Sequence, residues 1–230
     1  MKSLLSPRLL ACCSFIAPHS RVADVGCDHG YLGITLLQKG LADHIYAGDV
    51  NEGPLQSAVY NAEKYGVQDH IQFFLSDGLR NFPRDFDTLV CAGMGADTIV
   101  SILEAAPWIR DFRYTLVLQC QSKTPFLRQY LSAQQWNICE ETVARDGRFL
   151  YTVMKVTYPA ATALTPAQCY FPPALLVNPS AELANYYRQV TAKLQRAIDG
   201  QKDQADPNLV AALHTLLNDP CFAFLKEEIK

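Results

Sequence analysis

The sequence lacks a strong net charge and a long apolar run. Its 20 Lys and Arg residues against 23 Asp and Glu residues give a formal net charge of −3, which counts against a protein that coats nucleic acid with a broad basic face. No stretch reaches the roughly 18 apolar residues that a membrane span requires. Pro7 and Arg8 interrupt the leucine-rich start before a signal-peptide core can form. We therefore expect a cytoplasmic protein with no membrane partner.

The eight cysteines lack the spacing of a metal site or of a disulfide framework. No Cys-x-x-Cys pair occurs, and no histidine lies at ligand spacing from a cysteine. We accordingly expect no bound metal and a reducing compartment. Apolar residues make up 49% of the chain, which excludes a disordered protein. The 230 residues suffice for one large domain, or for a domain of about 150 residues with a small appendage.

What is present is an alternation of β-branched runs with helical patterns, typical of βαβ units in a parallel sheet. The predicted strands lie at 21–25, 44–48, 71–75, 87–92 and 114–119, and the predicted helices at 31–39, 54–65, 96–105 and 125–132. Two further strand-like runs, 138–144 and 149–158, are joined through Asp146-Gly147, a strong hairpin signal. The predicted fold class is α/β, with a mostly parallel, Rossmann-like sheet that ends in an antiparallel hairpin. A class I methyltransferase closes its sheet in this way, whereas a dinucleotide dehydrogenase continues with parallel strands.

The composition changes after the domain predicted at 1–158. Five prolines close together predict a connector at 159–179 rather than a regular element. A small helical hairpin of coiled-coil type is predicted at 180–230, with Ser180 capping its first helix and Asp206-Pro207 opening its second. The apolar side chains expected to form its seam are Leu183, Tyr187, Val190, Leu194 and Ala197, faced by Val210, Leu213 and Leu217.

Three basic residues of that first helix, Arg188, Lys193 and Arg196, point away from the apolar stripe at about 100° per residue. They form either an ordinary solvated face or a strip that contacts RNA phosphates. The sequence leaves both interpretations open.

The most informative segment is 23–32, at the turn from the first strand into the first helix. Its glycines, Gly26 and Gly30, permit a tight turn and let a ligand approach the backbone. Asp28 stands where a dinucleotide-binding fingerprint has its middle glycine, and together with Asp24 it would repel a diphosphate. The two carboxylates suit a ligand that carries an ammonium and a sulfonium group, which describes S-adenosylmethionine.

Two more aspartates follow the next two strands. Asp49 comes 23 residues after Gly26, where a carboxylate can accept both ribose hydroxyls of an adenosyl group. Asp77, with Gly78, follows the third strand, where its carboxylate would bond the adenine amino group. Each aspartate alone could be a turn or cap residue. Their joint placement at the carboxyl ends of parallel strands favours a cofactor crevice.

The loop at 91–97, after the fourth strand, offers only backbone atoms and Met94 to a substrate. Amino-group methyltransferases place Asn or Asp, two prolines and an aromatic residue here, because an exocyclic amine needs hydrogen-bond acceptors. A ring nitrogen with its own lone pair needs none, so alignment and stabilisation of a cationic product would carry the catalysis. The alternative is a plain strand-to-helix turn that requires small residues.

Four motifs give the chain a resemblance to a known family. They are Asp-His-Gly-Tyr within 24–32, Gly-Asp-Val at 48–50 with Gly-Pro-Leu at 53–55, Asp-Gly-Leu at 77–79 and Ala-Gly-Met-Gly at 92–95. Over essentially the whole chain, including the helical tail, the sequence resembles the bacterial tRNA (adenine(22)-N1)-methyltransferase family known as TrmK. The resemblance implies methyl transfer from S-adenosylmethionine to N1 of an adenine in the D-arm region of tRNA.

The resemblance also implies roles for the motif residues. The cofactor would be held by Asp24, Gly26, Asp28, Gly30, Asp49, Val50, Asp77, Gly78, Ala92 and Gly93. The methyl group and the target base would be bordered by His29, Tyr31, Gly93, Met94 and Gln121. Tyr31 would stack on or orient the base, or else be a core tyrosine of its helix. His29 is equally often a cap or turn residue.

The chain departs from the family at two places. Ala96 stands where glycine is usual, and 118–121 reads Leu-Gln-Cys-Gln in place of Leu-Gln-Pro-Asn. Two other functions stay open beside an RNA methyltransferase. One is a methyltransferase of a small molecule or protein, and the other is a binding protein that keeps the pocket without the chemistry. We expect a monomer.

Overall fold

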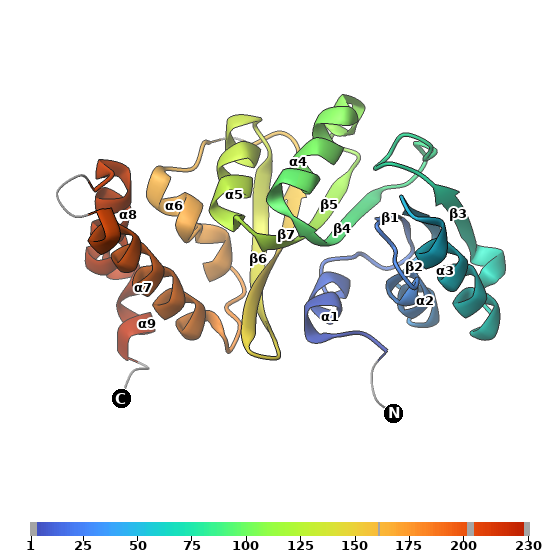
Figure 1. Ribbon diagram of the computed structural model, residues 1–230, viewed down its shortest axis with the longest axis horizontal. Helices are drawn as coiled ribbons and strands as arrows, with labels where there is room; N and C mark the ends of the chain where they lie inside the picture. The colour runs from blue at the N-terminus through green and yellow to red at the C-terminus, as the bar shows by residue number, and fades with distance from the viewer. Residues whose placement is uncertain (1–3, 161, 202–204, 228–230) are drawn as a thin grey trace.

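A computed structural model describes residues 4–160, 162–201 and 205–227. Its centre is a seven-stranded sheet in the order β3-β2-β1-β4-β5-β7-β6 (Figure 1). The strands are β1 (Ser20–Val25), β2 (Ala42–Asp49), β3 (Ile71–Leu75), β4 (Thr88–Gly95), β5 (Thr115–Ser122), β6 (Asn137–Asp146) and β7 (Phe149–Thr157). Strands β1 to β5 are parallel, while β7 runs antiparallel to both β5 and β6. The predicted mostly parallel sheet with a terminal antiparallel hairpin is confirmed.

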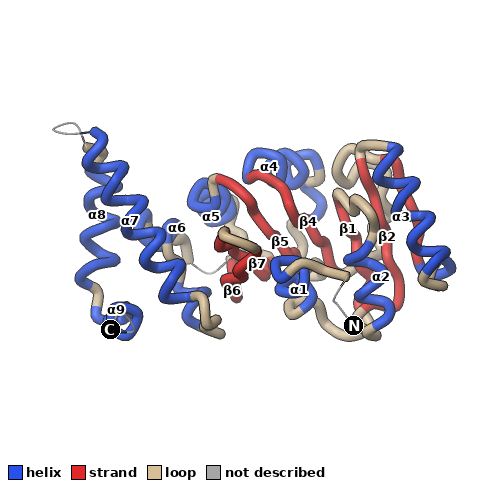
Figure 2. Tube along the Cα trace, turned by 60° about the horizontal axis from the view of Figure 1, so that its bottom comes forward, coloured by secondary structure: helices blue, strands red, loops and turns tan. Residues whose placement is uncertain are grey.

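Helices cover both faces of the sheet, because right-handed crossovers add β2 and β3 on one side of β1, and then β4 and β5 on its other side (Figure 2). One face carries α1 (Pro7–Cys13), α2 (Tyr31–Gln38) and α3 (Glu52–Lys64), and the other carries α4 (Ala96–Ala105) and α5 (Thr124–Ala133). Single-turn helices η1 (Gln68–His70) and η2 (Pro107–Ile109) lead into β3 and towards β5. Each face has its own apolar core, so the sheet is buried on both sides, as parallel sheets normally are.

A third core lies beyond the β6–β7 hairpin. It is built from α6 (Pro166–Tyr170), η3 (Pro173–Leu176), α7 (Leu183–Gln201), α8 (Pro207–Asn218), η5 (Pro220–Phe222) and α9 (Ala223–Glu227). The segment 159–179, predicted as a connector without elements, thus forms α6 and η3. A capping box between Thr165 and Gln168 starts α6. Phe171 and Leu175 are buried against α7 and α8, so apolar burial outweighs the breaking tendency of the prolines.

The predicted seam of the helical hairpin is right for part of α7 and wrong for part of α8. Leu183, Tyr187 and Leu194 are buried on α7, but Ala197 is exposed. On α8 the predicted Val210 and Leu217 are exposed. The residues that pack there are Leu209, Ala212, Leu213 and Leu216. The physical reason is that α8 packs on both α6 and α7, and η5 adds Phe222 to the same cluster, so the buried face of α8 includes Leu209 and Leu216 as well as the predicted Leu213.

A buried ion pair joins the sheet to these helices. Arg128 on α5 and Glu141 on β6 are both fully buried, and Arg128 Nη2 lies 2.6 Å from Glu141 Oε1. Arg128 also donates to the carbonyls of Cys169 and Tyr170 and to the hydroxyl of Tyr186 on α7. Four elements, α5, β6, α6 and α7, therefore meet at one guanidinium.

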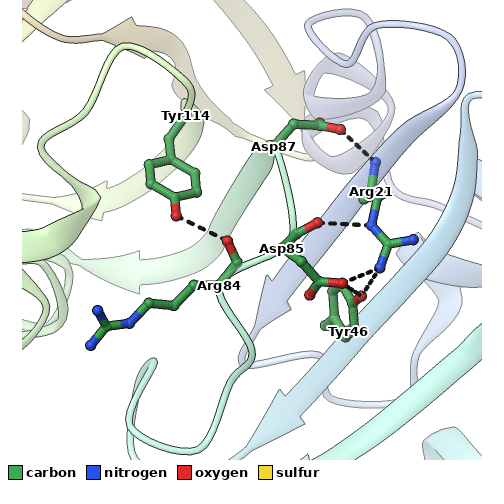
Figure 3. A network of polar contacts seen from close by, with 6 residues as sticks. All are labelled: Arg21, Tyr46, Arg84, Asp85, Asp87 and Tyr114. Atoms are coloured by element: carbon green, nitrogen blue, oxygen red, sulfur yellow. Dashed lines mark hydrogen bonds and ion pairs between the residues drawn. The ribbon is translucent and has the colours of Figure 1, made fainter.

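The amino edge of the sheet is tied by a polar network (Figure 3). The side chain of Arg21 on β1 donates to the carbonyl and carboxylate of Asp85, and its backbone N–H donates to Asp87 Oδ2 at 2.9 Å. The hydroxyl of Tyr46 donates to the same Asp85 carboxylate at 2.9 Å. Tyr114 donates to the carbonyl of Arg84 at 3.0 Å. The network fixes the long segment between β3 and β4 at the edge opposite the carboxyl ends.

No helix within the described ranges is long and apolar enough to cross a membrane. In the same part of the chain, no three His, Cys, Asp or Glu side chains are grouped so that they could share a metal ion.

Candidate active site

Two adjoining cavities open at the carboxyl edge of β1 to β4. The first, of about 480 Å³, lies between the ends of β2 and β3 and helix α4. The second, of about 410 Å³, lies between the ends of β1 and β4 and helices α1 and α2. Gly26, Asp49 and Met94 line both cavities. A ligand that occupies both would therefore pass over these three residues.

Gly26 and Met94 form the boundary between the cavities. Gly26 has φ +75°, and a Cβ atom added to it would lie 2.5 Å from Met94 Cε. Only glycine combines this backbone conformation with the close approach of Met94. The thioether side chain of Met94 thus lies directly over the turn that follows β1.

Asp24, at the end of β1, carries an unsatisfied carboxylate into the second cavity. The residue is 3% exposed, and its Oδ2 has no hydrogen-bond partner in the part of the chain that the structure describes. Burial, with a further contribution from the Asp49 carboxylate, raises the pKa of Asp24 to about 7. A buried acceptor without a partner is costly. A cation entering the second cavity would satisfy it.

Asp49 is held at the junction by backbone donors. Its Oδ1 accepts from the N–H of Asn51 at 2.9 Å, and its Oδ2 accepts from the N–H of Asp28 at 3.3 Å. Asp28 has φ +50° and an exposed carboxylate at the rim of the second cavity, 3.6 Å from His29 Nε2. Asp49 therefore presents its carboxylate to both cavities, and Asp28 adds a second carboxylate to the second cavity.

The first cavity collects the predicted residues of the second and third strands. Val50, Asp77 and Gly78 line it together with Gly26 and Asp49. The exposed carboxylate of Asp77 pairs with Arg80, with 3.2 Å between Oδ2 and Nη1. Ile102 on α4 forms an apolar wall against Gly78. The lining of the first cavity thus combines the apolar side chain of Ile102 with the carboxylates of Asp49 and Asp77.

The second cavity collects the residues predicted to border the methyl group and the base. Its lining includes Asp24, Asp28, His29, Tyr31, Ala92, Gly93, Met94 and Gln121. The ring centroids of His29 and Tyr31 lie 6.1 Å apart at the start of α2. All of these predicted side chains come together at one opening, and their catalytic roles stay predictions.

Gly30 and the three basic residues of α7 lie outside both cavities. Gly30 caps α2 with φ +72°, and an added Cβ would lie 3.0 Å from Ala58 Cβ, so it serves the packing of α2 on α3. Arg188, Lys193 and Arg196 are exposed on α7. Lys193 lines a third cavity, of about 290 Å³, that it shares with Gln121 at the mouth of the second. Contact of these three residues with RNA stays a prediction.

Two further residues of the site, Arg8 and Gln119, were not predicted from the sequence. Gln119 is fully buried, and its Oε1 accepts from Arg8 Nη1 at 3.0 Å and from the N–H of Gly93 at 2.9 Å. Arg8 Nε also lies 3.4 Å from Asp146 Oδ2. The signal for Gln119 was an amide in the otherwise apolar run of β5. That for Arg8 was a lone cation one turn before the buried Cys12.

Comparison with known proteins gives a consistent result. The methyltransferase domain family model matches residues 5–154. The tRNA (adenine(22)-N(1))-methyltransferase of Bacillus subtilis is 30% identical over 151 residues, which cover 65% of this chain and 63% of that enzyme, so the match spans less than two thirds of it. A proposed tRNA methyltransferase of Mycoplasma pneumoniae is 34% identical over 183 residues, covering 74% of this chain and 82% of that protein.

A solved structure agrees over nearly the whole chain. It is a Streptococcus pneumoniae protein, proposed as a tRNA (m1A22) methyltransferase and solved in complex with S-adenosyl-L-methionine. It is 28% identical with a TM-score of 0.81, and the match covers 94% of this chain and 100% of that one.

The strand order, the terminal hairpin and the family match define a class I methyltransferase. Within that class, the chain belongs to the bacterial tRNA (adenine(22)-N1)-methyltransferase family known as TrmK, as the resemblance of its motifs implied.

Proposed function

We propose that this protein transfers a methyl group from S-adenosylmethionine to N1 of adenine 22 in tRNA. The observation that carries the proposal is the pair of cavities that meet at Gly26 and Met94, with the unpartnered Asp24 carboxylate in the second. The named relatives and the complex with S-adenosyl-L-methionine support the same activity.

The residues present fit this cofactor. Asp24 offers a buried carboxylate to its ammonium group, and Gly26 leaves the backbone open to its methionyl chain. Asp49 would hold the ribose and Asp77 the adenine amino group, with Ile102 packed on the adenine ring. Arg8 is the one Lys or Arg side chain among the described residues that line the second cavity, so we assign it to the cofactor carboxylate.

S-adenosylmethionine, when bound, supplies an electrophilic methyl group. The side chains of Tyr31 and His29 would orient the adenine ring so that its N1 lone pair faces this group. When the methyl group leaves the sulfonium sulfur for N1, the positive charge would move from the sulfur to the base ring, and the carboxylate of Asp28 beside the cavity would stabilise it there. Gly93 and Met94 offer no side-chain acceptor, which suits a ring nitrogen better than an exocyclic amine.

The target lies in the D-arm region under this proposal, and the enzyme acts as a monomer. The second cavity, of about 410 Å³, is too small for a whole duplex, so the adenine must leave its stack to enter, as it does for other base-modifying enzymes. A small-molecule or protein methyltransferase is the second candidate, which the pI of about 5.9 favours.

The proposal is tested with labelled S-adenosylmethionine and two unmodified tRNA transcripts that carry adenine or guanine at position 22. Labelling of the adenine transcript alone is the expected result. Equal labelling of both transcripts contradicts the proposed position. Binding of S-adenosylmethionine without labelling of any tRNA would leave only a binding role.

A further inference from the structure

The β6–β7 hairpin extends past the sheet edge at which both cavities open. Pairing between β5 and β7 ends at Cys120 and Thr152, whereas β6 and β7 stay paired as far as Asp146 and Phe149. Three further residue pairs at about 3.3 Å each carry the hairpin about 10 Å beyond its last pair with β5, whereas β5 itself continues for only two residues, to Ser122. The tip of the hairpin thus stands beside the path by which a substrate reaches the second cavity.

The tip carries a basic and aromatic surface, Arg148, Phe149 and Tyr151, which we call the hairpin platform. Phe149 is 51% exposed. The guanidinium of Arg148 lies 4.9 Å from its ring centroid, and the ring of Tyr151 lies 6.1 Å away. Neither hydrophobic burial nor a hairpin turn requires an exposed phenylalanine here, since Asp146-Gly147 already forms the turn.

The platform faces the same side of the sheet as the second cavity. Side chains alternate along a strand, so Phe149 and Tyr151 share the face of Val153. Val153 belongs to the core that also contains residues of α1 and α2. Asp146, which pairs with Phe149 across the hairpin, lies 3.4 Å from Arg8, and Arg8 lines the cavity. This ion pair anchors the platform next to the site.

The charge around the platform is suited to an anion. The carboxylate of Asp146 is paired with Arg8, and that of Glu182 with Arg145, where Nε lies 2.8 Å from Oε1. Arg148 is left on the platform with no carboxylate partner among the described residues. A phosphate is therefore attracted here, while the flat face of Phe149 suits a ring.

We propose that the hairpin platform binds an unpaired nucleotide of the RNA next to the target base. Phe149 stacks on its base, and Arg148 contacts its phosphate. The inference rests on the proposed function and adds a contact surface that lies outside both cavities. Stacking on an aromatic ring tolerates any base, so the platform contributes affinity and placement and leaves the choice of the methylated base to the cavity.

The chain offers a matched control in Phe112. This residue is 81% exposed, but it precedes β5 and so lies at the amino edge, opposite the cavities. Its neighbour Arg113 is already bonded to Asp111. Both phenylalanines are exposed surface residues, so removing either ring has a similar small effect on folding.

The experiment compares Phe149→Ala, Phe149→Trp and Phe112→Ala in direct binding of an unmodified tRNA transcript and of S-adenosylhomocysteine. Loss of one stacked base weakens tRNA binding by about tenfold or more. We therefore expect that loss for Phe149→Ala, near wild-type tRNA affinity for Phe149→Trp and Phe112→Ala, and unchanged S-adenosylhomocysteine affinity for all three. Arg148→Gln should lower the slope of log affinity against log salt by about one.

Equal tRNA affinity of Phe149→Ala and Phe112→Ala would contradict the proposal that the hairpin platform binds RNA. A parallel loss of S-adenosylhomocysteine binding in Phe149→Ala also overturns it, because the hairpin would then act on the fold of the site. The two proposals fail separately. If the wild-type protein methylates no tRNA but binds it through Phe149, the proposed methyl transfer is wrong, while the proposed RNA binding by the hairpin platform is supported.

Discussion

At the scale of single residues, Asp24 couples the cofactor site to pH. Burial keeps its pKa at about 7 in the folded protein, while the unfolded chain has an ordinary carboxyl value near 3.8. The folded state therefore binds this proton more tightly than the unfolded state does. The contribution of Asp24 to stability is most favourable below about pH 4 and is lost as the pH rises through about 7.

We predict that affinity for S-adenosylhomocysteine rises with pH from 5.5 and levels off above about 7. Only the ionised carboxylate of Asp24 attracts the ligand ammonium, and a shift of one pH unit below the pKa reduces its ionised fraction by up to about tenfold. Calorimetric titration over this range measures the effect. The Asp24→Asn variant should bind more weakly and with a flat profile. A flat profile in the wild-type protein would contradict the role.

A second prediction at this scale concerns Arg8. Replacing Arg8 with Met should weaken S-adenosylhomocysteine binding by about tenfold or more, the usual cost of a lost charge-assisted hydrogen bond. Binding of 5′-methylthioadenosine, which lacks the amino-acid end, should stay within about twofold. An equal loss for both ligands would mean instead that Arg8 acts through Gln119 and the Gly93 loop.

At the scale of elements, the Arg128–Glu141 pair links α5 and β6 to the C-terminal helices α6 and α7. Both side chains are fully buried, so removing one charge leaves the other without compensation. We predict that Glu141→Gln lowers the free energy of unfolding by about 3 to 5 kcal/mol, as measured by urea denaturation. Removing the solvent-exposed Asp111–Arg113 ion pair through Asp111→Asn should leave the free energy of unfolding almost unchanged, because water screens the pair.

The elements also show what a sequence can and cannot reveal. The βαβ alternation predicted the sheet because its strands are apolar runs that only burial explains. The face that α8 buries could not be predicted, since it depends on packing against α6, an element that the sequence did not predict, as well as against α7. The prolines of 159–179 predicted a connector, but Phe171 in this segment is fully buried. Its burial is a tertiary contact, which local sequence propensities cannot predict.

The residues of the site also fall into those that the sequence predicts and those that it does not. Asp24, Asp49 and Asp77 were predictable because the carboxyl ends of parallel strands meet at one edge. Arg8 was not, because its place in the second cavity depends on α1 packing across the sheet against β6 and β7, far away in sequence. Gly30 has the sequence signature of a ligand-binding glycine but serves the packing of α2 on α3.

At the scale of the whole molecule, a net charge of −3 is compatible with RNA binding because the charges are separated in space. Carboxylates gather at the cavities, while Arg188, Lys193 and Arg196 are exposed on α7. Lys193 shares a cavity with Gln121 at the mouth of the site. We therefore expect an RNA that reaches the second cavity to pass close to this basic helix.

We predict that changing Arg188, Lys193 and Arg196 together to Gln weakens tRNA binding and lowers its salt slope by up to about three. S-adenosylhomocysteine affinity should not change. The matched control removes three positive charges elsewhere, at Lys39, Lys64 and Arg113, which are also exposed. If both triple variants lose the same affinity, the effect is one of net charge and the strip on α7 is an ordinary solvated face.

The polar network at the amino edge has a consequence for how this protein can vary over evolutionary time. It joins Arg21, Tyr46 and Asp85 a full strand length from the cavities, so changes there shift stability and leave ligand contacts alone. The left-handed backbone at Asp28 costs energy at the opposite edge. Substitutions that strengthen the network at the amino edge would raise the stability of the protein. A more stable protein would still fold after destabilising substitutions in the turn around Asp28.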